Sequence, residues 1–310
     1  MDHWKIIVTK HIETTFNIIY GYRCNYSCEG CCNGSNFVKD KNHDPDLQKI
    51  LDAIECLPQY IEIDPNGMIT LLGGEPFVYW EERIKPIAIK CREAFPNAKI
   101  NIFSNGHTAF KFKEDIINFI NKYNCNVTIS NHLKGDMQSI LGKQWLNNIV
   151  KFLDDEMIIK IHDEHYHIKD NINANIYFYH SDTWLSWYKT NNIGQIKPYN
   201  SNSAEKSMKY GCASGSVCTA MFESKIYKCG SIAMLKGLLK QKNQIEDVDW
   251  KTYLDYPAFD VLQKNTSNFS YHVNNYGKPV TYCTMCNNDP DNVMLWTDRT
   301  KNMIIPSKTI

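Results

Sequence analysis

The sequence predicts an α/β fold in which a partial (β/α)6 barrel of the TIM type is followed by a small C-terminal extension. Short apolar and β-branched runs alternate with longer amphipathic segments through the first part of the chain, which is the pattern of repeated βα units and a parallel sheet. The strand candidates are almost continuously apolar, as expected for parallel strands buried on both faces. Near residue 183 the composition shifts toward Asn, Ser and Lys. We therefore predict a barrel over residues 1–182 and an extension over residues 183–310.

Six strands and four helices account for the predicted barrel. The strands are expected at 16–22, 68–73, 98–104, 126–130, 157–162 and 173–179. Apolar residues at helical spacing predict helices between the first five strands, at 45–57, 80–94, 112–123 and 138–153. In the extension, the pattern indicates two short strands around a turn, at 219–224 and 225–229, and a helix at 231–242.

The composition narrows the range of partners. The 310 residues include 34 basic and 34 acidic side chains, so no global field attracts nucleic acid or an anionic membrane. The N-terminus lacks the features of a secretory signal, and no apolar run is long enough to span a bilayer. We therefore expect a cytoplasmic protein with no membrane partner and no general nucleic-acid binding. In a reducing compartment, its 12 cysteines are expected to be ligands, reactive thiols or buried residues rather than disulfides.

Three cysteines form a closely spaced group after the first predicted strand. Cys24, Cys28 and Cys31 lie in the run CNYSCEGC. Four thiolates complete an iron-sulfur cluster, whereas three leave one iron with an open position for a substrate or cofactor. Cys32 is expected to be a structural or incidental thiol, because the side chains of adjacent residues diverge and Cys31 and Cys32 are not expected to bind the same iron.

Two further motifs follow the next two strands. GGEP (73–76) comes after the second strand and SNG (104–106) after the third. Barrels of this type place function in the loops at the carboxyl ends of their strands, so the three motifs are expected to meet at one mouth. Paired glycines let backbone approach a ligand closely, and the carboxylate of Glu75 can accept hydrogen bonds from a ligand ammonium group. GGEP alone can also be an ordinary turn, but its position favours a binding role.

CxxxCxxC followed by GGEP resembles the radical S-adenosylmethionine superfamily, whose members usually have a partial six-stranded β/α barrel. The resemblance covers about residues 14–180. It implies that Cys24, Cys28 and Cys31 hold a 4Fe-4S cluster whose open iron is chelated by the amino and carboxylate groups of S-adenosylmethionine. It also implies a cofactor pocket that is made of Gly73, Gly74, Glu75 and Pro76 near the methionine amino group, Ser104 and Asn105 near the ribose, and Ser130.

The same resemblance implies the reaction class. Reductive cleavage of S-adenosylmethionine gives methionine and a 5′-deoxyadenosyl radical, which abstracts hydrogen from an unactivated carbon. A flavodoxin or ferredoxin is the implied reductant. One residue departs from the superfamily pattern: the position before the third cysteine is commonly aromatic and packs near the adenine, but here it is Gly30. Tyr26, in the same loop, is the candidate to replace it.

The C-terminal part resembles the SPASM/twitch extension of that superfamily, which holds auxiliary iron-sulfur clusters. Its usual pattern is a cysteine, 9 to 15 residues, a glycine, four residues and a second cysteine. Counting back from Cys229 puts Ser224 at the glycine position and Cys212 eleven residues before it, whereas Cys218 leaves too short a gap. Cys283 and Cys286 then complete a set of four, which corresponds to the single-cluster twitch form. Zinc is the rival occupant, because four cysteines with a CxxC pair also make a structural zinc site; the barrel motifs favour a 4Fe-4S cluster.

Other candidate residues receive less specific interpretations. Cys218 is expected to be a buried residue, with a thiol that returns a hydrogen atom to a substrate radical as the alternative. Cys56, Cys91 and Cys125 are expected in the core. Residues at the end of the fifth strand are expected to line the substrate mouth or to be solvated rather than to bind a metal: His162, Asp163, Glu164, His165 and His167. Five aromatic residues are expected in the core rather than on a sugar or peptide: Tyr177, Tyr179, Trp184, Trp187 and Tyr188.

The substrate is the least defined part of the prediction. About 23 residues precede the cysteine loop, too few for a leader-binding domain. This favours oxidation or epimerisation of a small polar metabolite such as a sugar or aminocyclitol. A ribosomal peptide or a nucleotide is the alternative substrate. A non-catalytic iron-sulfur or zinc protein is the alternative class, but an electron carrier would not need the cofactor pocket that GGEP and SNG imply.

Overall fold

The computed structural model of the chain describes residues 10–28, 31–35, 41–131, 140–162, 164–179, 183–184, 186–191, 194–212, 218–289 and 294–295. One sheet of ten strands dominates this part of the chain, in the order β13-β12-β11-β1-β2-β3-β4-β7-β6-β5. Within the described residues, β13 and β5 do not pair, so the sheet is a partial barrel and not a closed one. The fold is therefore the α/β class that the sequence predicts.

Six neighbouring strands of this sheet are parallel. Five belong to the barrel segment: β1 (His11–Gly21), β2 (Ile61–Gly73), β3 (Lys99–Ser104), β4 (Cys125–Ser130) and β7 (Asn171–Tyr179). The sixth is β11 (Cys218–Phe222), which pairs with the free edge of β1 in the register Thr15 to Cys218. The extension thus completes the parallel part of the sheet, and its hairpin continues through β12 (Lys225–Tyr227) to β13 (Phe259–Asp260).

The predicted fifth strand does not lie where the sequence analysis expected it. β5 (Ile158–His162) pairs antiparallel with β6 (His165–Ile168), and β6 pairs antiparallel with β7. Only residues 163 and 164 separate β5 from β6, and strands joined by so short a turn can pair only in antiparallel fashion. β7 therefore takes the place beside β4, and β5 becomes the edge of the sheet.

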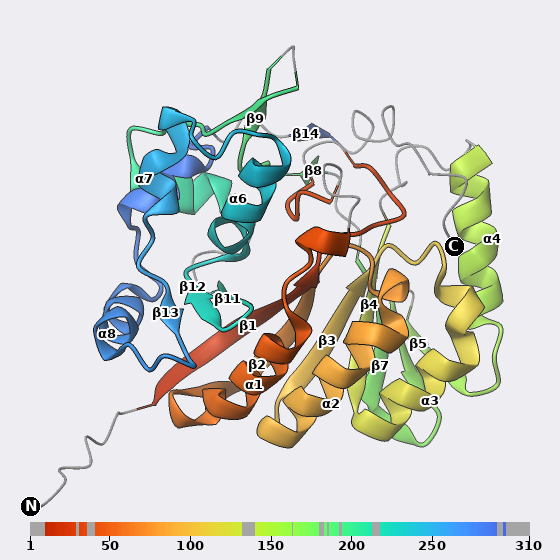
Figure 1. Cartoon of the computed structure of the whole chain (residues 1–310). Coiled ribbons are helices and arrows are strands. Elements are labelled where there is room, and N and C mark those ends of the chain that lie inside the picture. Colours follow the sequence, from red (N-terminus) through yellow and green to blue (C-terminus); the bar gives the residue numbers. More distant parts are fainter. Residues whose placement is uncertain are drawn as a thin grey trace, which may run out of the picture.

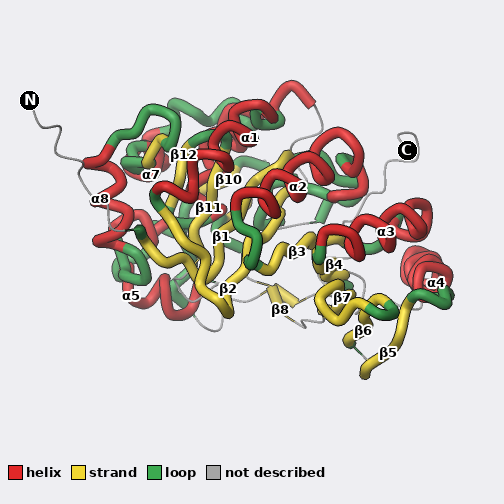
Figure 2. Tube along the Cα trace, turned by 90° about the horizontal axis from the view of Figure 1, so that it is seen from below, coloured by secondary structure: helices red, strands yellow, loops and turns green. Residues whose placement is uncertain are grey.

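The predicted helices are present, with small shifts at their ends. They are α1 (Leu47–Cys56), the π-helix η4 (Trp80–Ile84) continued by α2 (Lys85–Ala94), α3 (Lys113–Tyr123), α4 (Ile140–Leu153) and, in the extension, α6 (Gly230–Gln241). The side chain of Asp46 caps α1 by accepting the backbone N–H of Lys49 at 3.2 Å. α1, α2 and α3 lie along one face of the sheet (Figures 1 and 2).

Short elements connect these parts. The remaining helices are α5 (Ala204–Lys206), α7 (Lys251–Leu254) and α8 (Thr266–Asn275), the π-helix η7 (Ser207–Gly211) and the 3-10 turns η1 (Lys41–His43), η2 (Leu57–Gln59), η3 (Pro76–Val78), η5 (Ala109–Phe112), η8 (Val248–Trp250) and η9 (Thr281–Met285). Two small antiparallel pairs are formed by β9 (Lys189–Thr190) with β10 (Ile196–Lys197) and by β8 (Thr183–Trp184) with β14 (Met294–Leu295).

Two main cores hold the fold together. The larger lies between the sheet and the barrel helices and includes Cys91 and Cys125, both fully buried, with Cys56 packed against it. The core expectation for these three cysteines is thus confirmed. The smaller core belongs to the extension and is centred on Trp187, Leu235, Leu238 and Trp250. Within the described part of the chain, no helix combines the length and apolarity that crossing a bilayer requires.

Candidate cofactor and cysteine sites

A cavity of about 830 Å³ lies against the face of the sheet opposite to the helices. Side chains two residues apart on a strand point to the same face, so its wall is built from alternate strand positions. The wall residues at alternate positions are Thr15 and Asn17 (β1), Met68, Thr70 and Leu72 (β2), Lys99, Asn101 and Phe103 (β3), Asn126, Thr128 and Ser130 (β4), and Tyr177 (β7), with Phe178 beside Tyr177. The intervening residues, such as Phe16 and Ile69, belong to the core under the helices.

The wall of this cavity includes buried polar side chains among apolar ones such as Met68, Leu72 and Phe103. Asn17, Thr70, Asn101, Asn126 and Thr128 are all buried. The Thr128 hydroxyl donates to Asn101 Oδ1 at 3.0 Å. The sequence analysis did not predict these wall residues. They could have been recognised as polar residues at alternate positions of otherwise apolar strands.

Cys24, Cys28 and Cys31 all line the same cavity, just past the end of β1. Arg23 anchors the start of their loop: its guanidinium pairs with Asp44 at 3.1 Å and also with Glu82, and its backbone N–H donates to the Tyr79 hydroxyl at 2.6 Å. The extension anchors the end of the loop, because Trp187 Nε1 donates to the Cys32 carbonyl at 2.9 Å. The loop is therefore held from both parts of the chain.

The thiol of Cys24 is buried and lies near those of Cys28 and Cys31. Burial raises its pKa well above the ordinary thiol value, and the nearby Glu75, Cys28 and Cys31 raise it further. Three soft sulfur donors that line one end of the cavity suit iron-sulfur ligation, and coordination would hold them as thiolates. Beside them, the buried Asn25 Nδ2 has no hydrogen-bond partner within the described residues, so a donor is available for a sulfide or thiolate acceptor.

The paired glycines of GGEP are required by the packing of β2 against the end of β1. A Cβ on Gly74 would lie 1.8 Å from the Arg23 carbonyl oxygen, and a Cβ on Gly73 would lie 2.6 Å from the Gly21 carbonyl oxygen. These glycines were expected to admit a ligand. They do line the cavity, but the close approach that demands glycine is to the chain's own backbone. Pro76 begins η3, is buried and is not part of the cavity wall.

Glu75 is the best-positioned polar group at this end of the cavity. It is 1 % exposed; its Oε1 accepts the Ser104 hydroxyl at 2.7 Å, and its Oε2 accepts the Asn105 backbone N–H at 2.8 Å. Burial raises its pKa to about 7, although these hydrogen bonds act in the opposite direction. A ligand cation would compensate the buried charge.

The other predicted cofactor residues lie along the same wall. Ser104, Asn105 and Ser130 all line the cavity, and Asn105 Nδ2 donates to Asn25 Oδ1 at 2.8 Å. Tyr26 also lines it, and its hydroxyl is 3.1 Å from Nδ1 of His107. Sequence reasoning missed His107, which directly follows SNG. Gly30 lies outside the described residues.

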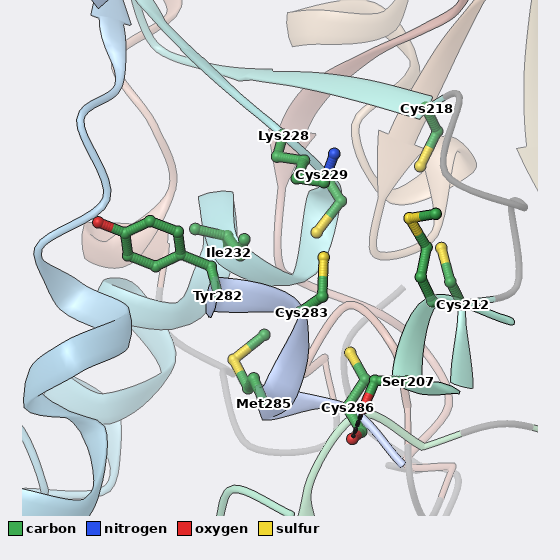
Figure 3. Close-up of a pocket in the computed structure, with 11 residues that line it drawn as sticks. Ser207, Cys212, Cys218, Lys228, Cys229, Ile232, Tyr282, Cys283, Met285 and Cys286 are labelled. Carbon is green, nitrogen blue, oxygen red and sulfur yellow. Dashed lines mark hydrogen bonds between the residues drawn. The ribbon is translucent and has the colours of Figure 1, made fainter. Parts of the chain in front are cut away.

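Five cysteines surround a second, smaller pocket in the extension (Figure 3). Cys212 follows η7, Cys229 precedes α6, and Cys283 and Cys286 lie in and after η9. Cys218, at the start of β11, is the fifth. Their sulfur atoms point toward a common space (Figure 3). Burial, together with neighbouring thiols, raises the pKa of both Cys229 and Cys286.

The structure thus brings the four predicted auxiliary cysteines together and adds Cys218. Apolar side chains, including Met208, Ile232 and Met285, complete the pocket wall. Four of the five cysteines also line the 830 Å³ cavity: Cys212, Cys218, Cys229 and Cys286. The cavity therefore extends from the barrel cysteines to the cysteines of the extension.

The turn before Cys229 explains how serine can occupy the glycine position of the twitch pattern. The left-handed residue of the β11–β12 turn is Glu223, with φ of 53°, and Ser224 does not have positive φ. The backbone carbonyl oxygen of Ser224 accepts a hydrogen bond from the Val261 N–H at 2.9 Å. The expected cost of serine in place of glycine therefore does not arise at this position.

The remaining sequence candidates divide between core and cavity. Trp187 and Tyr188 are buried, as expected, although Trp187 also reaches the cavity; Tyr177 lines the cavity. His165 stacks on Tyr177 with 4.7 Å between ring centroids and hydrogen-bonds Asn175 at 2.8 Å. Among the described side chains, His165 and His167 belong to no group with metal-ligand spacing. The side chains of His162, Tyr179 and Trp184, and all of Asp163, lie outside the described residues.

Comparison with known proteins gives one family match and several distant structural likenesses. Residues 15–147 match the family described as a 4Fe-4S single cluster domain. No curated protein sequence matches the chain at a significant level.

Three solved structures illustrate the likenesses. BtrN in complex with AdoMet and 2-DOIA is 13 % identical, covering 90 % of this chain and 95 % of that one with a TM-score of 0.45. Native anSMEcpe with bound AdoMet is 11 % identical, covering 87 % and 94 % with a TM-score of 0.33. SuiB of Streptococcus suis bound to precursor peptide SuiA is 14 % identical, covering 79 % and 67 % with a TM-score of 0.32. All three likenesses are distant.

Proposed function

We propose that the chain is a radical S-adenosylmethionine enzyme that abstracts hydrogen from a small polar substrate held in the barrel cavity; its CxxxCxxC and GGEP motifs and the match of residues 15–147 to a 4Fe-4S single cluster domain support this. The observation that carries this proposal is the cavity itself. One space of about 830 Å³ is lined at one end by three cysteines and Glu75, along its wall by amides and hydroxyls, and at its other border by the cysteines of the extension.

The barrel end of the cavity is proposed to bind the cofactors. Cys24, Cys28 and Cys31 would hold the 4Fe-4S cluster, with S-adenosylmethionine beside it. When bound and reduced, this pair supplies a 5′-deoxyadenosyl radical. The carboxylate of Glu75 would accept hydrogen bonds from the methionine amino group, because Ser104 and Asn105 already fix its two oxygens in place. Gly73, Gly74 and Ser130 would complete the pocket wall.

The neutral polar side chains in the cavity wall support a neutral, hydroxyl-bearing substrate. Among the described residues that line the cavity, Glu75 and Lys99 are the charged ones, and the polar side chains between them are neutral amides and hydroxyls, set among apolar residues such as Met68, Leu72 and Phe103. Such groups donate and accept hydrogen bonds without requiring a counter-charge. The volume is within the usual range of small-molecule sites, roughly 300–1,000 Å³. A sugar or aminocyclitol is therefore the preferred substrate class, and a peptide side chain or nucleotide is the alternative.

The extension is proposed to make the reaction an oxidation. Cys212, Cys229, Cys283 and Cys286 would hold a second 4Fe-4S cluster at the border of the substrate cavity. Converting a carbinol to a carbonyl after hydrogen abstraction requires the loss of one further electron and one proton, and a cluster in this place could accept the electron. Zinc in the same pocket could not, because it has no redox chemistry. Electron supply by a flavodoxin or ferredoxin and a cytoplasmic location remain predictions.

Anaerobic reconstitution with iron and sulfide tests the proposal. With dithionite and S-adenosylmethionine, the wild-type protein is expected to form 5′-deoxyadenosine, and the Cys24/Cys28/Cys31 triple alanine variant is expected to form none while keeping about four irons. A Cys56→Ser variant serves as the matched control, because this cysteine packs against the core away from both sites. A wild-type protein with full iron that formed no 5′-deoxyadenosine, with or without a panel of sugars and aminocyclitols, would contradict the proposal.

A further inference from the structure

A cluster of two histidines and a glutamate, with Glu13 and His272 buried and His11 partly buried, lies at the start of β1. His11 and Glu13 are two residues apart on this strand, so their side chains share a face. His272 reaches them from α8, 259 residues along the chain from Glu13. The cluster is at the opposite end of β1 from the cysteine loop, and none of its three residues lines the 830 Å³ cavity. It is therefore separate from the proposed catalytic site.

The ligand-type atoms of this cluster converge on one point. His272 Nε2 is 2.9 Å from Glu13 Oε1, and His11 Nε2 is 3.7 Å from the same oxygen. All three ligand atoms lie within 4.8 Å of one another. Glu13 is 0 % exposed and His272 is 3 % exposed. This arrangement buries a carboxylate beside two imidazole nitrogens.

Hydrogen bonds account for only part of this convergence. His272 can donate to Glu13, but His11 Nε2 is buried and has no hydrogen-bond partner in the described part of the chain. Buried polar atoms are rarely left unpaired, because an unmade hydrogen bond in the interior is costly. A cation between the three residues would satisfy His11 and Glu13 together. Two imidazole nitrogens and one carboxylate oxygen, with water as the fourth ligand, are a common zinc set.

The surroundings supply the support that metal ligands usually have. The Thr219 hydroxyl donates to Glu13 Oε2 at 2.7 Å, which leaves Oε1 directed at the histidines. Hydrogen-bond partners of this kind orient the metal ligands, and their loss typically weakens metal binding about 10- to 100-fold. The ring of Tyr276 contacts that of His11 with 4.4 Å between centroids. Three elements therefore meet at the cluster: β1 of the barrel, and β11 and α8 of the extension.

We propose that His11, Glu13 and His272 bind one zinc ion, which fastens α8 of the extension to the first strand of the barrel. The site does not line the substrate cavity, and its ligands join β1 to α8, so we assign it a structural role. It is distinct from both cysteine sites in ligand type and in position.

Metal analysis of the anaerobically reconstituted protein tests this site. After exposure to zinc and removal of loosely bound metal, the wild type is expected to retain about one zinc with nitrogen and oxygen ligands at roughly 2.0–2.1 Å by X-ray absorption. Glu13→Gln keeps the side-chain shape and hydrogen bonding, and His11→Phe keeps the packing on Tyr276; both are expected to lose the zinc. Thr219→Val is expected to bind it about 10-fold more weakly. Glu62→Gln, an exposed change on β2, is the control and should retain it.

Two results would overturn the proposal. One is a wild-type protein that holds no zinc, or only zinc with a sulfur first shell, which would assign the metal to the cysteines. The other is equal zinc retention by Glu13→Gln and His11→Phe. Thermal unfolding gives an independent readout: added zinc should raise the Tm of the wild type and of Glu62→Gln but not that of His11→Phe.

Discussion

The barrel and the extension each gather cysteines, but they surround them differently. The barrel places three cysteines at one end of a large cavity, next to polar groups that are already oriented: Glu75, Ser104 and Asn105. The extension places five cysteines around a small pocket whose other walls include Met208, Ile232 and Met285. An incomplete ligand set beside polar groups leaves room for a polar ligand on the metal, whereas a surplus of thiols in apolar surroundings can saturate a cluster. Cysteine ligands are therefore suited to an open cluster that binds a cofactor in the barrel and to a fully ligated cluster in the extension.

The largest effect is expected from removing a cysteine of the barrel site. Cys28→Ala should lower 5′-deoxyadenosine formation by more than about 100-fold. Loss of a residue that only orients a metal ligand typically costs up to roughly that factor, and loss of a ligand itself should cost more. Cys286→Ala should still cleave S-adenosylmethionine, because its pocket belongs to the extension. Equal losses in the two variants, measured by chromatography under the same reducing conditions, would remove the distinction between the sites.

Iron content should sharpen the assignment of ligands in the extension. Replacing Cys212, Cys229, Cys283 or Cys286 by alanine should reduce the iron from about eight to about four atoms per chain. Cys218→Ala should keep all of it, since four thiolates suffice. If Cys218→Ala lost iron and one of the other variants did not, the set of four would include Cys218. Zinc in place of iron in the wild-type pocket would instead support the structural alternative.

Cofactor binding in the barrel site should depend on pH near neutrality. Burial raises the pKa of Glu75 to about 7, so below that pH the carboxyl group is protonated and must release its proton before it can bind an ammonium group. Affinity for S-adenosylmethionine should therefore fall as the pH decreases below about 7, by up to about tenfold per unit. Glu75→Gln should bind weakly and lack this dependence, whereas Glu81→Gln, which is exposed, should behave as wild type. The measurement is equilibrium binding of S-adenosylmethionine between about pH 6 and 8. If Glu75→Gln showed the same pH dependence of affinity as the wild type, a group other than Glu75 would be responsible for it.

The smallest of these effects concerns the polar wall that joins the two regions. Asn101→Leu removes an amide that accepts the Thr128 hydroxyl, and it should raise the KM for a sugar or aminocyclitol about 10- to 100-fold, as loss of a buried hydrogen-bonding group does. The exposed Asn173→Leu on β7 is the matched control. Steady-state kinetics with the best substrate of a neutral polyol panel would check this. A KM that did not change would place the substrate away from β3.

Local patterns identified most of the barrel, whereas long-range pairing could not be read from them. The strands at 68–73, 98–104 and 126–130 and all five helices agree with the structure, because apolar periodicity reports which face of an element is buried. The placement of 157–162 was wrong, since a run of apolar residues does not reveal whether its next partner is a helix or a strand. The predicted hairpin at 219–229 was correct, but its pairing with β1 depends on residues about 200 positions apart.

The sites divide in the same way. Short spacing predicted Cys24, Cys28 and Cys31 as ligands, and the GGEP and SNG motifs predicted Glu75 and Ser104 beside them; the structure places all five in the lining of one cavity. The role of the paired glycines needed the structure, because it depends on the backbone of β1. The histidine and glutamate cluster could not be found from spacing, since His272 is far from His11 and Glu13 in the sequence.

The most direct test of the contrast between the two regions is electron paramagnetic resonance of the reduced protein with and without S-adenosylmethionine. In a variant that keeps only the barrel cysteines, with Cys212, Cys229, Cys283 and Cys286 replaced by alanine, the cofactor should change the cluster signal. In the Cys24/Cys28/Cys31 triple alanine variant, the signal of the extension cluster should stay the same when the cofactor is added. A cofactor-dependent change in the extension cluster, or none in the barrel cluster, would contradict the assignment of an open and a saturated site.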